Sequence, residues 1–331
     1  MKYRSVADLD EDVVAWLPQL PADLELIVGI PRSGLLVASL LALHLNLPMT
    51  DVAGLTEGRV LQPGPRYSHD VTGLLDEPRR VLVVDDSVLL GRQLETVKTR
   101  VRTARLAHTV RYAALYPAPE SEHHVDFYFE IVETPRCFEW NLMHHPWVLS
   151  KTCMDIDGVL CRDPSPAEND DGPQYRRFLT SSERRYLPTV PVRWLVTARL
   201  EKYRALTEEW LRANGVEYRE LIMMDYPDMD ARRAANAYAS FKADAYARTG
   251  ALLFVESSST LAAEVARLSG KSVFCVETRR MIDPEFLSRM RRTTRELPRH
   301  LPGWVGDALR RRSVSARATR SEDDPERQAL K

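Results

Sequence analysis

Two pairs of carboxylates in the sequence have the spacing that phosphate and ribose chemistry require. Asp155 and Asp157 lie two residues apart before Gly158, and Asp85 and Asp86 are adjacent. Residues two apart on a strand face the same side, so one carboxylate of the first pair can attack phosphorus while the other moves the leaving-group proton. Adjacent carboxylates just beyond a strand can bind two neighbouring hydroxyls of a ribose. The chain therefore offers two candidate sites with different chemistry.

Three more residues extend the pattern that begins at Asp155. Thr197 offers a hydroxyl to a phosphoryl oxygen, Lys242 offers a cation to a phosphorylated aspartate, and Glu256 offers a third acid. Crowded carboxylates need a counter-charge, and Mg²⁺ prefers their oxygens as ligands. The residues follow one another at gaps of 42, 45 and 14, and the lysine is one of only seven in the chain. An isolated acid pair also fits a plain turn at a strand end, but the whole order argues against that alternative.

This order resembles the haloacid dehalogenase-like (HAD) phosphatases over about residues 147–277. The resemblance implies that Asp155 is the nucleophile and that Asp157 is the general acid and base. It implies that Thr197 and Lys242 contact the phosphoryl group. It also implies a Mg²⁺ ion on the carboxylate of the nucleophile, the main-chain carbonyl of the second aspartate, and Glu256.

Two features of this half bear on metal binding and access. Ser257 stands where the family often has a second aspartate, so either metal binding is weaker or the serine holds a bound water. Only 39 residues separate Asp157 from Thr197, which leaves no room for a large cap domain. The predicted site is therefore open or covered by a small flap. An open site suits a large substrate, or closure by the N-terminal domain or by another subunit of a homodimer.

Two strand–turn–helix units in the first half are suited to phosphate. The first contains Arg32, Ser33 and Gly34 before a predicted helix, and the second runs from Ser87 to Gly91 before another. Free backbone N–H groups and a helix N-terminus favour an anion, and glycine lets the backbone approach closely. The first unit alone also fits an ordinary tight turn.

Together the two units resemble the type I phosphoribosyltransferases over about residues 22–115. The resemblance implies that Asp85 and Asp86 hold the ribose hydroxyls, directly or through Mg²⁺. It implies that the first unit binds pyrophosphate and that the second binds the 5′-phosphate. The implied substrates are phosphoribosyl pyrophosphate (PRPP) and a nucleobase or nucleotide, while the second half would take a nucleotide or sugar phosphate.

The first half also departs from its family. Leu90, Arg92 and Gln93 stand where the family usually has threonines, so fewer hydroxyls are available to the 5′-phosphate. A module that binds a nucleotide without turnover is therefore an alternative. The glycine-rich segment 53–76 resembles the catalytic flap of the family. Its candidate charges are Arg59, Arg66 and His69.

An aromatic residue with a polar neighbour ends the first half. Trp140 could stack on a base while Asn141 bonds to its edge. Packing in the core or between domains is the alternative interpretation.

Length and composition set the broad class. A chain of 331 residues corresponds to roughly two domains. Its net charge of −1, with 46 basic and 47 acidic residues, argues against nucleic acid as a partner. The longest apolar run, about 11 residues, is too short for a bilayer, which needs about 20. The four cysteines form no CxxC pair, so a zinc or disulfide framework is not expected, and a cytoplasmic location is.

Strands alternate with helices along the chain, which predicts an α/β fold. We expect two three-layer Rossmannoid domains, each with a mainly parallel sheet flanked by helices, at residues 1–146 and 147–300, followed by a mostly disordered tail at 301–331. The expected strands are 24–30, 81–84, 110–115, 125–132, 148–154, 192–196, 221–224, 251–255 and 272–276. The expected helices are 35–45, 91–102, 200–213, 230–248 and 259–269.

The sequence thus predicts a bifunctional enzyme with a PRPP-dependent transfer site and a HAD phosphatase. In series the two reactions would make or salvage a nucleoside-like metabolite. One alternative is a phosphatase gated by a nucleotide-sensing first domain that does not catalyse transfer. Another is a scaffold of two degenerate enzyme folds.

Overall fold

The computed structural model describes residues 1–62, 64, 67 and 70–284. Residues 1–282 form one compact unit, and the described residues 283 and 284 lie outside it. The predicted boundaries at residues 146 and 300 stay predictions. The predicted disordered tail lies outside the described residues.

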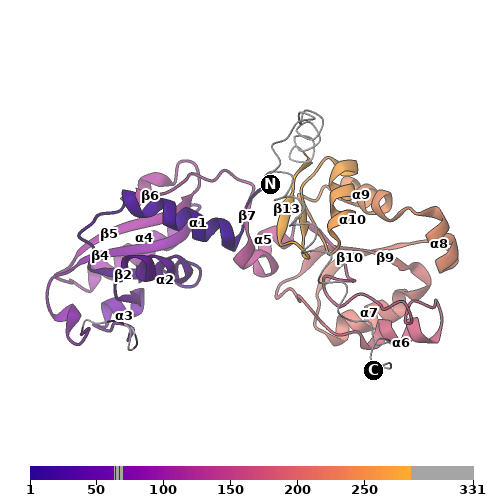
Figure 1. Cartoon of the computed structure of the whole chain (residues 1–331), viewed down its shortest axis with the longest axis horizontal. Coiled ribbons are helices and arrows are strands. Elements are labelled where there is room, and N and C mark those ends of the chain that lie inside the picture. The colour runs from indigo at the N-terminus through magenta and orange to yellow at the C-terminus, as the bar shows by residue number, and fades with distance from the viewer. Residues whose placement is uncertain (63, 65–66, 68–69, 285–331) are drawn as a thin grey trace, which may run out of the picture. The chain divides into compact units, whose positions relative to one another are not determined.

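The first sheet has five parallel strands in the order β3-β2-β4-β5-β6 (Figure 1). Its strands are β2 Leu26–Gly29, β3 Met49–Asp51, β4 Arg80–Val88, β5 Thr109–Pro117 and β6 Phe127–Tyr128. The helices around it are α1 Val6–Trp16, α2 Gly34–Leu45, α3 Val52–Thr56 and α4 Arg92–Thr103. The apolar cores place α1 and α2 on one face and α3 and α4 on the other. This half is therefore a three-layer α/β structure, as predicted.

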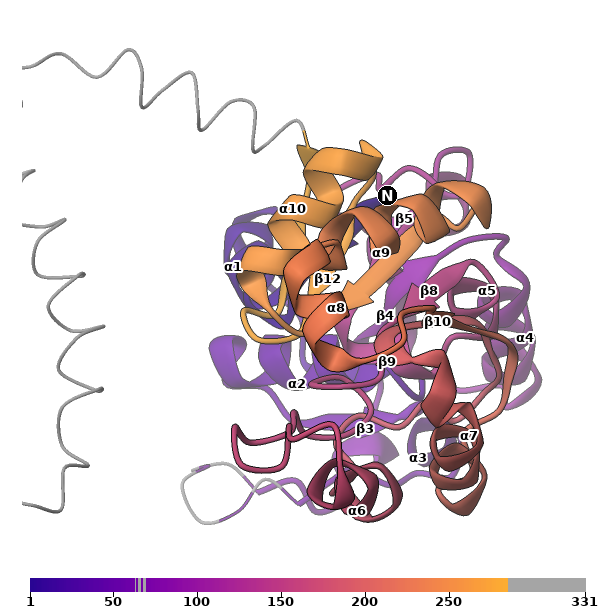
Figure 2. The ribbon, with the colours of Figure 1, turned by 90° about the vertical axis from the view of Figure 1, so that its right-hand side faces the viewer.

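The second sheet has six strands in the order β10-β9-β8-β11-β12-β13, parallel except for β13 (Figures 1 and 2). Its strands are β8 Thr152–Met154, β9 Val192–Leu200, β10 Tyr218–Met224, β11 Leu253–Glu256, β12 Val273–Cys275 and β13 Arg280–Ile282. Its helices are α6 Pro173–Ser181, α7 Arg204–Ala213, α8 Met229–Ala235, α9 Tyr238–Arg248 and α10 Ser259–Ser269. The α6 and α7 side chains share one core with the sheet, whereas α9 and α10 lie on its other face (Figure 2). This half is therefore also a three-layer structure, with a mainly parallel sheet between two layers of helices, as predicted.

The remaining elements lie between or beside the two sheets. A two-stranded parallel pair joins β1 Lys2–Arg4 to β7 Arg136–Phe138. Two short helices follow β7 in the chain, the 3-10 helix η4 Glu139–His144 and the α-helix α5 Pro146–Leu149. Within the described part of the chain, no helix combines the length and the apolar character needed to cross a bilayer.

Several of the expected elements differ in the structure. The expected strand 148–154 is α5 followed by the short β8, because Pro146 starts a helical turn. The expected helix 230–248 is two helices, since Asn236 adopts a left-handed φ of 45° between α8 and α9. The expected strand 125–132 shrinks to β6. The expected loop 53–76 begins within α3 and ends in a 3-10 turn, Leu74–Asp76.

Two candidate phosphate sites

The three charged residues of the second site meet at the carboxyl edge of its sheet. Asp155 follows β8, Glu256 ends the neighbouring β11, and Lys242 reaches the same edge from α9. The Lys242 Nζ lies 2.6 Å from Asp155 Oδ2 and 2.6 Å from Glu256 Oε2. All three side chains are buried, with exposures of 5%, 1% and 2% for the aspartate, the glutamate and the lysine. The structure therefore brings together residues that lie about a hundred positions apart in the sequence.

Burial and the crowded charges set the protonation of this cluster. Burial raises the pKa of Asp155, and the nearby Glu256 and Asp157 carboxylates raise it further, against the opposing effect of Lys242. Burial alone would lower the pKa of Lys242, but the two carboxylates outweigh it and the pKa is raised. The lysine is thus held as an ammonium ion, which is the form that can bind a phosphoryl oxygen.

Further oxygen atoms of a kind that suits Mg²⁺ lie next to this cluster. Ser257 Oγ lies 3.4 Å from the carbonyl oxygen of Asp157 and 3.3 Å from Glu256 Oε1. Asp155 contributes the remaining carboxylate, whose Oδ1 accepts the N–H of Ile156. Among the described residues, no group of three His, Cys, Asp or Glu side chains could hold a metal. The donor set predicted from the sequence is two carboxylates and a main-chain carbonyl, hard oxygens of the kind that Mg²⁺ takes together with water, and a metal at this place stays a prediction.

The carboxylate of Asp157 has a partner that the sequence reasoning missed. Arg199 in β9 is completely buried, and its Nη2 donates to Asp157 Oδ1 at 2.7 Å. Burial opposes the guanidinium charge, but the ion pair outweighs it and raises the Arg199 pKa. Arg199 also donates to Cys161 Sγ at 3.3 Å. The sequence held no regular signal for this contact, because the pairing of β9 with β10 shifts register between Thr197 and Leu200.

The position predicted for Thr197 needs a correction. We expected it to follow a strand that ends at residue 196, but β9 continues to Leu200. The strand outlasts β8, whose last paired residue is Met154, because it goes on pairing with β10 on its other side. Thr197 is fully buried, and its hydroxyl accepts the N–H of Arg199 at 3.3 Å. A contact between Thr197 and a phosphoryl oxygen stays a prediction.

The two acids of the first site also lie inside a strand rather than beyond one. We expected the strand to end at residue 84, but β4 continues to Val88 because it pairs with β5 throughout. Its other neighbour, β2, ends opposite Val84, so Asp85 and Asp86 line an edge that is open on that side. Asp85 Oδ1 accepts the N–H of Asp86 at 2.9 Å, and Asp86 Oδ2 accepts Nε1 of Trp140 at 2.7 Å. Burial, followed by the charge of Asp86, raises the pKa of Asp85.

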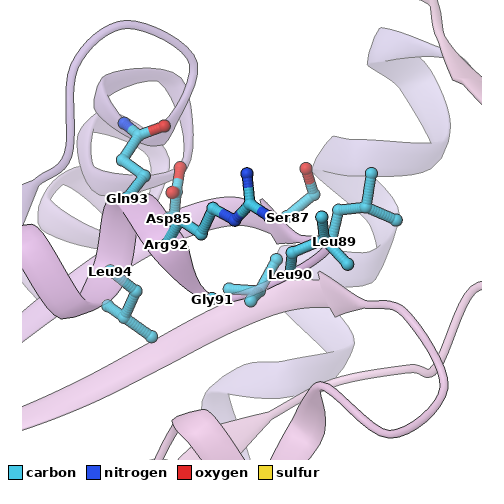
Figure 3. Close-up of a pocket in the computed structure, with 9 residues that line it drawn as sticks. Asp85, Ser87, Leu89, Leu90, Gly91, Arg92, Gln93 and Leu94 are labelled. Carbon is cyan, nitrogen blue, oxygen red and sulfur yellow. The ribbon is translucent and has the colours of Figure 1, made fainter.

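A pocket of about 310 Å³ lies beside these acids, over the start of α4. Its lining residues are Asp85, Ser87, Val88, Leu89, Leu90, Gly91, Arg92, Gln93 and Leu94. Figure 3 shows Arg92 and Gln93 extending from the start of the helix, with Ser87 near the end of β4 and the two leucines on the loop that follows it. Helix N-terminal N–H groups and an arginine favour a phosphate. Leu89 and Leu90 are exposed and offer no hydroxyl.

Two glycines allow the close approaches that shape this pocket. A Cβ on Gly34 would lie 2.9 Å from Asp85 Oδ1 and 2.7 Å from the carbonyl oxygen of Val84, so α2 can begin beside the acid only at a glycine. Gly91 has a φ of 70°, and a Cβ there would lie 2.5 Å from the His124 ring. Both positions were named from the sequence as parts of phosphate turns.

Arg32 and Ser33, the other residues of the first unit, belong to the described part of the chain, whereas two of the three flap charges do not. Arg32 is exposed and Ser33 precedes α2, and the neighbouring Pro31 carbonyl accepts Gln93 Nε2 at 3.0 Å. This bond joins the two predicted phosphate turns. Of the three flap charges, Arg59 pairs with Glu57 at 2.7 Å on the surface. The other two flap charges, Arg66 and His69, lie outside the described residues.

No protein-family model matches the sequence, and no curated protein matches it. Solved structures resemble part of it. A purine phosphoribosyltransferase from Pyrococcus horikoshii is 24% identical, with a TM-score of 0.31 over 42% of this chain and 92% of that chain. A xanthine-guanine-hypoxanthine phosphoribosyltransferase from Helicobacter pylori is 18% identical, with a TM-score of 0.31 over 42% and 92%. A Neisseria gonorrhoeae protein with bound ppGpp is 16% identical, with a TM-score of 0.32 over 42% and 89%. Similarity at this level does not indicate a function.

Proposed function

We propose that the chain is a two-site enzyme of nucleotide and sugar-phosphate metabolism. The first site transfers a phosphoribosyl group from PRPP, and the second hydrolyses a nucleotide or sugar phosphate with Mg²⁺. The main support is the position of the Lys242 ammonium, 2.6 Å from both Asp155 and Glu256. A buried cation between two acids at a sheet edge is the arrangement that a phosphorylated aspartate needs.

At the second site each residue has one task. Asp155 attacks phosphorus, the bond from phosphorus to the ester oxygen breaks, and Asp157 protonates that oxygen. Asp157 then takes a proton from the water that attacks the phosphoaspartate, which releases phosphate and restores the nucleophile. Lys242 and Thr197 hold the transferred oxygens throughout. A bound Mg²⁺ would supply further positive charge to the phosphoryl group.

The proton step requires a rearrangement of Asp157. Its carboxylate is paired with Arg199 at 2.7 Å. The proton that Asp157 gives to the ester oxygen comes from solvent in the first cycle, and in each later cycle it is the proton taken from the attacking water. The substrate therefore has to enter beside this ion pair and move the carboxylate toward the ester oxygen. Arg199 keeps that carboxylate anchored before the substrate arrives.

At the first site the phosphoribosyl group of PRPP is transferred from pyrophosphate to a base. The bond from C1′ to pyrophosphate breaks, a bond from C1′ to a base nitrogen forms, and the base loses its proton. Asp85 and Asp86 bind the ribose hydroxyls, the pocket over α4 binds the 5′-phosphate, and the turn at Arg32 binds pyrophosphate. The pocket of about 310 Å³ beside Asp85 is the supporting observation.

One experiment tests both activities. The full chain is incubated with Mg²⁺ and a panel of nucleotides and sugar phosphates, and separately with PRPP and candidate bases, while phosphate and pyrophosphate release are measured. We expect Asp155→Asn to abolish phosphate release and to leave pyrophosphate release unchanged, and Asp86→Asn to do the reverse. Phosphate release that survives Asp155→Asn refutes the phosphatase, and PRPP mixtures that yield no pyrophosphate refute the transferase.

A sensor is the second candidate for the first domain. The exposed Leu89 and Leu90 in the phosphate loop favour it, because they offer no hydroxyls to a transferred substrate. In that case the chain has no transferase activity, and nucleotide changes the rate of the phosphatase. Asp86→Ala would then abolish this response to nucleotide.

A further inference from the structure

The second acid of the first site is held by an aromatic residue from outside its strand. Trp140 lies in η4, after β7, and its Nε1 donates to Asp86 Oδ2 at 2.7 Å. An indole N–H is a donor only, so this bond needs an acceptor oxygen on the aspartate. From the sequence we expect Trp140 to stack on a base or to pack in a core. The hydrogen bond to Asp86 was not among these expectations.

The indole ring is fixed by two further aromatic rings. Its centroid lies 4.9 Å from that of Phe138 with the planes at 11°, and 6.4 Å from that of Tyr116. Phe138 and Tyr116 are buried and stack on each other at 5.6 Å. The Tyr116 hydroxyl is itself anchored, because it donates to Asp12 Oδ2 at 2.7 Å. The donor that reaches Asp86 is therefore rigid.

The aspartate needs such a partner because of its place in β4. Neighbouring residues on a strand point to opposite faces, so Asp86 would turn away from the face of Asp85. The main chain links the two acids, because Asp85 Oδ1 accepts the N–H of Asp86 at 2.9 Å. Arg136 adds a positive charge near Asp86 while its own N–H groups bind the carbonyls of Val88 and Tyr116. The indole N–H thus holds one oxygen of the buried Asp86 carboxylate in a defined position.

We propose that Trp140 is a positioning residue of the phosphoribosyl site, which holds the Asp86 carboxylate ready for a ribose hydroxyl of PRPP. This inference rests on the function proposed for the first half. Trp140→Phe keeps an aromatic ring in the stack but removes the pyrrole ring of the indole with its N–H group, so PRPP has to order the carboxylate itself. Ordering one side chain weakens binding by about three- to tenfold.

The test is a double-mutant cycle on the full chain with Mg²⁺. PRPP binding is measured by calorimetry for the wild type, Trp140→Phe, Asp86→Ala and the double variant, with exposed Trp147→Phe as the matched control. Alanine leaves no acceptor for the indole N–H, so we expect Trp140→Phe to raise the dissociation constant three- to tenfold in the wild-type background and to have no effect in the Asp86→Ala background. Trp140→His, which keeps a ring N–H, should recover part of the affinity, and the control should bind as the wild type does.

The outcomes separate this inference from the proposal beneath it. A wild type that does not bind PRPP refutes the transfer site, and the role of Trp140 with it. A wild type that binds PRPP while Trp140→Phe binds equally well overturns the positioning role alone. A loss of the same size in both backgrounds also overturns it, because Trp140 would then act independently of Asp86.

Discussion

Replacing Lys242 by methionine is the sharpest perturbation of the second site. The substitution keeps the length and apolar stem of the side chain and removes the ammonium. Two carboxylates, Asp155 and Glu256, would then be buried without the cation that lies 2.6 Å from each. They are also close enough for the charge of Glu256 to raise the pKa of Asp155. We therefore expect the substitution to destabilise the folded chain strongly.

The size of the effect follows from the geometry. At 2.6 Å and an effective dielectric constant of about 20, each ion pair has a gross attraction of about 6 kcal/mol. Desolvation of the three charges offsets most of this attraction, and removing one partner of a buried pair costs about 3–5 kcal/mol. The matched control is Lys202→Met, whose ion pair with Asp171 at 2.8 Å has a lysine side chain that is 37% exposed. We expect the control to cost about 0–1 kcal/mol.

The assay is urea denaturation at neutral pH in the presence of a chelator. We expect Lys242→Met to lower the free energy of unfolding by about 3–5 kcal/mol. Adding Asp155→Asn to this variant should recover part of the loss, because one of the unpaired charges is removed. A loss of less than about 1 kcal/mol for Lys242→Met, equal to that of the exposed control, would refute the reasoning.

Three further predictions concern other contacts. Arg199→Met leaves the Asp157 carboxylate without its ion-pair partner, so we expect it to lower the free energy of unfolding by about 3 kcal/mol in urea denaturation. An unchanged midpoint would contradict the ion pair. Gly91→Ala meets the His124 ring at a φ of 70°, so we expect a loss of about 1–3 kcal/mol by the same assay, and equal stability would contradict the close approach. Burial raises the pKa of Asp85 to about 9, above its unfolded value, so the folded state holds this proton more tightly and the contribution of Asp85 to stability falls as pH rises from about 4 to about 9. The stability of the wild type relative to Asp85→Asn should fall over that range, and a constant difference would contradict the burial.

The residues of the second site could be predicted from the sequence because parallel strands share a carboxyl edge. Asp155 and Glu256 each follow a short apolar run, which places them at that edge once the sheet forms. Lys242 was found through its rarity and its place in the order. Their meeting within 2.6 Å is a tertiary property that only the structure could supply.

The strand ends could not be predicted, because the length of a strand depends on its neighbours. β4 outlasts β2 since β5 continues to pair with it, and β9 outlasts β8 in the same way beside β10. The apolar runs stop at Val84 and Val196, whereas the strands continue through buried polar residues such as Asp85 and Thr197. Arg199 was missed for this reason, because a residue assigned to a loop was not considered as a partner for Asp157.

The most direct test of the phosphatase is the chemical state of residue 155 during turnover. The full chain is quenched while it hydrolyses a phosphate ester in the presence of Mg²⁺, reduced with borohydride, digested and studied by mass spectrometry. Borohydride converts an aspartyl phosphate to homoserine, so we predict homoserine at position 155 in the wild type and its absence from Asp155→Asn. Phosphate release by a wild type whose Asp155 remains an aspartate after reduction would contradict the central claim.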